Sequence, residues 1–200
     1  MADRLATVNT VMYGEISQGT RMTDQLSAQD WLDQGLKTLA RDGFTALKAE
    51  PLAKAMGVSR GSFYWHFADI GAFHAAVLGH WRDIAAERII ADVEASSGQD
   101  DPLSVLLRRV FGERLALETA VRGWAAIDPL ARKAVQAIDR RRLSYVGKLL
   151  ETSGLAPGIA AARAQILYWT FLGFALSDNP LPRAKQAAVL DELLRMASRS

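Results

Sequence analysis

Hydrophobic residues along the chain recur mainly at intervals of three and four positions, the spacing of a helix with one buried face. Ser27 is suited to cap a first helix, with Asp30 in its first turn, and Gly43 is suited to end it. No segment of the sequence alternates between apolar and polar residues in the manner of a strand bounded by hairpin turns. The pattern therefore predicts an all-α protein.

Two short helices are expected after the first one. The second covers about Ala49 to Met56, with Pro51 in the first turn, where its missing N–H costs nothing. Gly57 can adopt the positive φ of a tight turn. Ser59 is then placed to cap a third helix that continues through Phe67.

The remainder of the chain predicts longer helices. Asp69 is suited to cap a fourth one. Its expected apolar face consists of Ile70, Phe73, Val77, Trp81 and Ile84. Later helices are expected over about 103–118, 120–126, from Pro129 onward, over 159–177 and to the C-terminus. The helix that starts at Pro129 is expected to bury Leu130, Ala134, Ile138, Val146 and Leu149.

Composition limits the class of protein. Half of the 200 residues are apolar and 23% are charged, which is typical of a globular protein with a substantial core. The chain has no cysteine, which excludes disulfides and cysteine nucleophiles. The most apolar run, 166–176, is too short to span a bilayer, and the opening residues lack the apolar core of a signal peptide. We therefore expect a cytoplasmic protein without membrane contact.

The net charge of +2 does not by itself indicate a nucleic-acid partner, so that argument depends on where the cations lie. A short helix, a glycine turn and a second short helix form the helix-turn-helix pattern, whose second helix enters the DNA major groove. The start of that helix carries Ser59, Arg60, Gly61 and Ser62. Arg60 can form two hydrogen bonds with a guanine, worth about 1–3 kcal/mol of discrimination. Gly61 has no side chain to keep the backbone from the DNA.

Residues 52–67, LAKAMGVSRGSFYWHF, resemble the helix-turn-helix signature of TetR-type transcriptional regulators, notably in the pattern GVSxGxxYxHF. The resemblance is specific over 28–82 and looser over the rest, including 122–143. It implies an N-terminal three-helix DNA-binding domain followed by a C-terminal helical bundle. It also implies a homodimer on a near-palindromic double-stranded DNA operator, and a small-molecule effector inside the bundle, most simply as a ligand-released repressor.

The family pattern also implies individual contacts. Residues expected to meet bases are Arg60, Ser62 and Trp65, and those expected to hold phosphates are Lys48, Ser59, Tyr64 and His66. One position departs from the pattern, because Ile70 stands where the family usually has a phosphate-binding lysine. We therefore expect Arg4 and Arg21 of the N-terminal arm to contribute, so that deletion of residues 1–22 weakens operator binding at matched salt.

Three regions are expected: a flexible arm at 1–25, the DNA-binding domain at 26–70 and an effector-binding and dimerisation domain at 71–200. Pocket candidates in the last region are Phe111, Arg122, Trp124, Asp128, Tyr168 and Trp169, which suit a hydrophobic or aromatic effector. For each of them, plain core packing is the alternative. Small residues expected at a four-helix dimer interface are Ala160, Ala161, Ala164, Gly173 and Ala175.

The sequence does not indicate a metal site, a cofactor site or an enzyme active site. The histidines at 66, 74 and 80 lack the clustering of a metal site, and no cofactor motif is present. Asp128, Asp139, Glu113 and Glu118 do not form an acid/base pair by spacing, so no enzyme is expected. The run DRRR at 139–142 is interpreted as a solvated helix face. The alternative function is a helical small-molecule binding or scaffold protein without DNA-binding activity.

Overall fold

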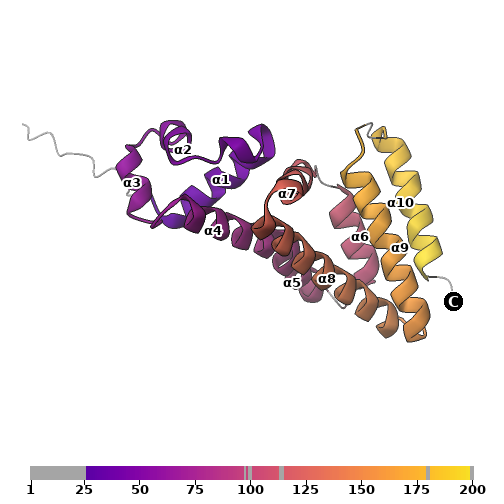
Figure 1. The fold of residues 1–200 in the computed structure, drawn as a ribbon. Helices are drawn as coiled ribbons and strands as arrows, with labels where there is room; N and C mark the ends of the chain where they lie inside the picture. Colours follow the sequence, from indigo (N-terminus) through magenta and orange to yellow (C-terminus); the bar gives the residue numbers. More distant parts are fainter. Residues whose placement is uncertain (1–25, 97, 99–100, 113–114, 179–180, 199–200) are drawn as a thin grey trace, which may run out of the picture.

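The computed structural model describes residues 26–96, 98, 101–112, 115–178 and 181–198, and this part of the chain is helical without strands. A small group of helices at one end, the head (residues 26–69), is joined by one long helical rod to a larger bundle (Figure 1). The arm at 1–25 lies outside the described residues. Within the described part, no helix is both long and apolar enough to cross a membrane.

The head consists of α1 (Ala28–Asp42), the 3₁₀ turn η1 (Phe44–Ala46), α2 (Ala49–Ala55) and α3 (Arg60–Tyr64). Ser27 and Asp30 form a capping box at the start of α1, since each side chain bonds the backbone N–H of the other residue. Gly57 has a φ of 69° between α2 and α3, as the turn requires. The predicted helix-turn-helix is confirmed.

Aromatic rings form the core of the head. Phe63 is fully buried, and its ring lies edge-on to Trp31 at a centroid distance of 5.3 Å and to Phe73 at 5.2 Å. Phe67 packs against Phe63 at 5.3 Å. The first and last aromatic residues of the stretch 63–67 therefore face inward, while Tyr64 and Trp65 are exposed.

A continuous rod connects head and bundle. It comprises α4 (Ile70–Arg82), the π-helical turn η2 (Asp83–Glu87) and α5 (Arg88–Ser96). Asp69 caps α4 by accepting a hydrogen bond from the Ala72 N–H at 2.7 Å. In η2 the Arg88 N–H donates to the Asp83 carbonyl, five residues back, so the rod contains one wide turn where it enters the bundle.

The bundle is completed by α6 (Pro102–Gly112), α7 (Ala116–Ile127), α8 (Pro129–Thr152), α9 (Pro157–Ala175) and α10 (Arg183–Ser198). One hydrophobic cluster joins the head to α7 and the first half of α8. A second joins α5, α6, α9 and α10 to the second half of α8. The head is therefore packed directly on the bundle through α7, in addition to the rod.

The structure corrects several predicted boundaries. The third helix ends at Tyr64 rather than Phe67, because the N–H groups of His66 and Phe67 both bond back to the Phe63 carbonyl and close a turn. The break expected near residue 119 lies instead between α6 and α7, which places Glu118 on the buried face of α7. The chain continues in helical form through the rod, and the hydrophobic pattern did not predict its π turn.

Two residues assigned to buried faces are exposed. Ile70 and Leu130 occupy the first turns of α4 and α8. They are 37% and 46% exposed, respectively. The buried residues of these two helices begin at Phe73 and Ala131 instead.

Candidate functional site

The start of α3 forms an exposed edge of the head. Ser59 takes the N-cap position, and Arg60 and Gly61 are exposed, whereas Ser62 is half-buried. Among the described residues, the Ser59 side chain makes no capping hydrogen bond to α3, whereas the Ser27 hydroxyl caps α1. A Cβ added at Gly61 would meet only the Ser59 Oγ, at 3.6 Å. The backbone at Gly61 is therefore open to a partner from outside.

Two aromatic residues extend this edge. The guanidinium of Arg60 lies 5.6 Å from the centroid of the Tyr64 ring, in a cation–π contact that limits its freedom. Trp65 is 83% exposed, which is unusual for tryptophan and indicates a residue available to a partner. Lys48, at the N-cap of α2, is exposed, and His66 is half-buried beside α3. Seven of the eight predicted DNA contacts thus lie on α3 or within two residues of its ends, and Lys48 lies at the start of α2.

The bundle contains a cavity of about 570 Å³ between the rod and helices α6 to α9. This volume is within the range of small-molecule sites. Most of its lining is apolar, with residues from both sides of η2 forming one wall. Of the six pocket candidates, Phe111 and Tyr168 line the cavity.

The other four candidates lie outside the lining. Trp124 is buried in the cluster that joins head and bundle, and Asp128 caps α8 by accepting from the Ala131 N–H at 2.8 Å. Trp169 is 64% exposed on the outer side of α9. Arg122 does not line the cavity itself but donates to the hydroxyl of Tyr168, which does, at 2.8 Å.

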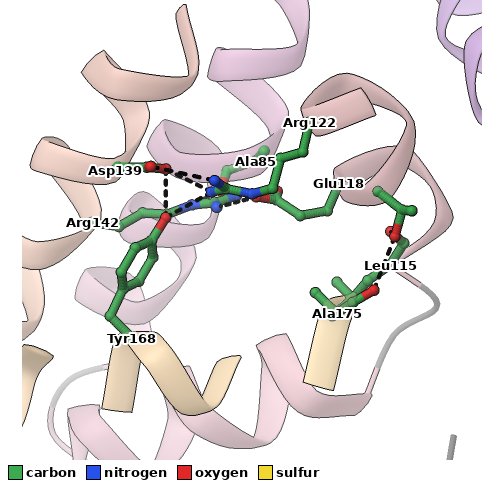
Figure 2. A network of polar contacts seen from close by, with 9 residues as sticks. Ala85, Leu115, Glu118, Arg122, Asp139, Arg142, Tyr168 and Ala175 are labelled. Atoms are coloured by element: carbon green, nitrogen blue, oxygen red, sulfur yellow. Dashed lines mark hydrogen bonds and ion pairs between the residues drawn. The ribbon is translucent and has the colours of Figure 1, made fainter. Parts of the chain in front are cut away.

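A network of polar and charged side chains joins α7, α8 and α9 (Figure 2). Three of its members, Glu118, Arg142 and Tyr168, line the cavity. Glu118, only 4% exposed, accepts hydrogen bonds from Arg122 at 2.8 Å and from both terminal nitrogens of Arg142 at 3.0 Å. Asp139 accepts from Arg122 at 2.6 Å and from the Tyr168 hydroxyl at 2.5 Å. Two guanidinium groups thus face two carboxylates, and their formal charges cancel.

Burial and bonding shift the proton affinity of this network. Burial opposes the charge of Arg122, but the hydrogen bond to Asp139 and the nearby carboxylate of Glu118 raise its pKa above the ordinary value. Burial and then the bond to Asp139 raise the pKa of Tyr168, so its hydroxyl stays protonated as a donor.

The interpretation of residues 139–142 as a solvated face is wrong for Asp139 and Arg142, which are partly buried, whereas Arg140 and Arg141 are exposed. Arg142 is partly buried and donates to the Ala85 carbonyl at 3.1 and 3.3 Å as well as to Glu118. Arg141 pairs with Glu87 on the outer side of the same rod. The reason is that α8 packs along the rod, so this part of the run meets another helix instead of water.

Sequence reasoning missed Glu118, Asp139 and Arg142 as members of one site, although the spacing carried a signal. Glu118 precedes Val121 and Ala125 on the buried stripe of α7, and Arg142 follows Ile138 on that of α8. A charged residue on the buried face of a helix requires a partner of opposite charge. Glu118 and Arg142 both occupy such positions, so their pairing could have been expected.

Two of the histidines, His74 and His80, connect segments of the fold. The Nε2 atom of His74 lies 2.9 Å from the Leu47 carbonyl, and that of His80 lies 2.7 Å from the Asp33 carboxylate. Both contacts connect α4 to other segments of the head. Among the described residues, no group of three possible metal ligands occurs.

Comparisons with known proteins agree with this geometry. Residues 32–77 match the model of the bacterial regulatory proteins of the tetR family. The HTH-type transcriptional regulator AcrR of Shigella flexneri is 31% identical over 94 residues, which is 46% of this chain and 41% of AcrR. The matched region thus spans less than half of that relative.

Solved structures share the whole fold. The reduced form of NemR from E. coli superposes with a TM-score of 0.64 at 21% identity, covering 85% of this chain and 94% of NemR. A TetR family member from Streptomyces coelicolor has a TM-score of 0.58 at 24% identity, covering 82% and 96%. The head and bundle therefore have the architecture of helix-turn-helix regulators. The sequence match to the tetR family covers residues 32–77, and beyond it the solved structures show a common fold.

Proposed function

We propose that this chain binds DNA sequence-specifically and regulates transcription, as a homodimer on a near-palindromic operator. The observation that carries the proposal is the contrast in exposure among the six residues from Arg60 to Trp65, which comprise α3 and its C-cap. Phe63 is fully buried and fixes the helix to the head, while Arg60 and Trp65 are exposed. A rigid helix that presents a cation, a glycine and an aromatic ring outward suits the major groove.

The outer face of α9 supports the homodimer. Ile159 and Ile166 are seven residues apart, as are Trp169 and Leu176, and all four are exposed on this helix or at its end. Gly173 is exposed between them, which allows a close helix approach. Ala160 and Ala164 are buried within the chain itself, so these two belong to the internal core instead of the interface expected for them.

The cavity supports a small-molecule effector that is hydrophobic or aromatic. Glu118 and Arg142 in its lining pair with each other, and most of the remaining lining is apolar. An effector that binds better to a differently spread dimer would release DNA, as in a repressor. Two heads about 34 Å apart fit successive major grooves, and a full switch needs roughly 5.5 kcal/mol of differential affinity.

The test is selection of bound duplexes from a random DNA pool, followed by affinity measurement by fluorescence anisotropy. Arg60→Ala is expected to cost about 1–3 kcal/mol and to relax specificity at one base pair. Tyr64→Phe is expected to weaken binding to all selected sequences, because it removes a phosphate contact. Arg140→Ala, an exposed cation on α8, is the charge-matched control and should change little.

The outcome against the proposal is equally definite. A wild-type protein that enriches no duplex, yet takes up hydrophobic ligands, would be the small-molecule binding or scaffold protein of the alternative. Equal losses in Arg60→Ala and Arg140→Ala would reduce the interaction to nonspecific charge attraction.

A further inference from the structure

One side chain, that of Arg142, contacts both the cavity and the rod. Arg142 lines the cavity, and its guanidinium lies 5.2 Å from the centroid of the Phe171 ring, which also lines it. The same guanidinium donates two hydrogen bonds to the Ala85 carbonyl, inside the π turn η2. The same planar group therefore contacts both the cavity and the backbone of the rod, and its bonds to Ala85 and Glu118 are shown in Figure 2.

The π turn is the natural place for such a contact to act. A π turn is a rare irregularity inside an α-helix and is frequently found at functional sites. The turn η2 follows α4 directly, and α4 belongs to the core of the head through Phe73 and Val77. A change in η2 therefore alters how α4 leaves the head.

Glu118 fixes the position of Arg142. Its two carboxylate oxygens accept from Arg142, and a third bond from Arg122 leaves the acid little freedom to follow a displaced guanidinium. Movement of Arg142 toward or away from the cavity must therefore break bonds either to Glu118 or to Ala85. Such a network has discrete arrangements, which is the physical requirement for coupling two sites.

We infer that Arg142 is the positioning residue through which occupancy of the cavity reaches the head: a molecule packed against Phe171 displaces the guanidinium from the Ala85 carbonyl and changes the π turn. This inference rests on the proposed function, since it concerns regulation of DNA binding by the cavity. It differs from a general packing effect because it assigns the coupling to one side chain and one carbonyl.

A cavity-filling substitution provides the test without an identified ligand. Val110→Trp places an indole in the cavity, and its effect on affinity for the selected DNA is measured in three backgrounds: wild type, Arg142→Met and Arg141→Met. Arg141 is the matched control, since it pairs with the same rod at Glu87 but does not line the cavity. In the wild type and in Arg141→Met, Val110→Trp should weaken binding by a factor between about 5 and 150.

In Arg142→Met the same substitution should change affinity less than about twofold, because the coupling is already absent. Equal losses in all three backgrounds, or no loss in the wild type, would overturn the inference. Arg142→Lys provides a second variant if Arg142→Met does not fold, since lysine keeps the charge but cannot bond Glu118 and Ala85 in the fork geometry of arginine.

Hydrogen exchange separates this inference from the proposed function. The amides of residues 70–88 are followed by mass spectrometry in the same variants without DNA. Val110→Trp should speed their exchange in the wild type and in Arg141→Met but not in Arg142→Met, and identical changes in all backgrounds would again overturn the inference. A wild-type protein that selects no duplex removes the proposed function alone, because the exchange result still decides the coupling.

Discussion

The ring of Trp124 on α7 stacks on the ring of Phe44 in η1, with centroids 4.5 Å apart and planes inclined by 15°. His74 of α4 contacts both rings edge-on, at 5.1 Å from Phe44 and 5.4 Å from Trp124. Helix α7 of the bundle thus contacts the head directly, in addition to the covalent connection through the rod. The head is therefore held at two places, and its orientation depends on both.

Replacement of Phe44 by leucine should lower the free energy of unfolding by about 1 kcal/mol, because apolar volume is largely kept while the stacked ring contact is lost. Urea unfolding followed by far-ultraviolet circular dichroism measures this loss. Trp65→Leu is the control, since this exposed ring has no packing role in the head, and its effect should be within about 0.5 kcal/mol. Equal effects of the two substitutions would show that the stack does not stabilise the fold.

Replacement of Gly61 by alanine should separate stability from DNA binding. The added Cβ meets only the Ser59 Oγ at 3.6 Å, so the head should gain about 0.4–1 kcal/mol from the reduced entropy of the unfolded chain. The same methyl group should weaken operator binding in the anisotropy assay, because it holds the backbone away from the DNA. Gly79→Ala on α4, whose Cβ would meet nothing within 4 Å, should stabilise the protein without changing DNA affinity. Unchanged affinity in Gly61→Ala would mean that the backbone does not approach the groove there.

Local signals predicted the head well. Capping residues at Ser27 and Asp69 and the turn at Gly57 act within a few residues of themselves, so the sequence around them contains the full physical cause. The helix-turn-helix and its outward edge could be predicted for this reason. Whether Arg60 and its neighbours contact bases stays a prediction.

The cavity wall could not be predicted in the same way. Glu118, Asp139 and Tyr168 lie on three helices, and their meeting depends on how α7, α8 and α9 cross. Periodicity indicates which face of a helix is buried but not which residue of another helix it meets. The π turn at Asp83–Glu87 is a further case, since its residues are compatible with an ordinary α-helix and only packing reveals the extra residue.

The raised pKa of Tyr168 predicts a pH dependence of stability. A group whose pKa is higher in the folded than in the unfolded protein stabilises the fold fully below its unfolded value, here near 10.0, and loses that contribution as the pH rises through the folded value. Tyr168→Phe should therefore be less stable than the wild type near neutral pH, and the difference should shrink from about pH 9 to about pH 11.

Urea unfolding of both proteins across this range measures the difference directly. Phe171→Leu is the control, because it removes ring volume from the same cavity but no hydroxyl, so its destabilisation should be independent of pH. A Tyr168→Phe curve parallel to that of the wild type would contradict the assigned proton on the Tyr168 hydroxyl.

The exposed stripe on α9 predicts the outcome of charge insertion. Ile166→Glu and Trp169→Glu each place a carboxylate on the face proposed to pack against a second copy of the chain, and a twofold axis brings two such charges together. Desolvation and repulsion should raise the dimer dissociation constant at least tenfold, as measured by sedimentation velocity over a concentration series. Operator affinity should fall with it, because a single head contacts one half-site. Leu130→Glu, at an exposed apolar residue in the first turn of α8, is the matched control and should leave the assembly unchanged. A monomeric wild-type protein, or a dimer insensitive to both α9 substitutions, would place the interface elsewhere or remove it.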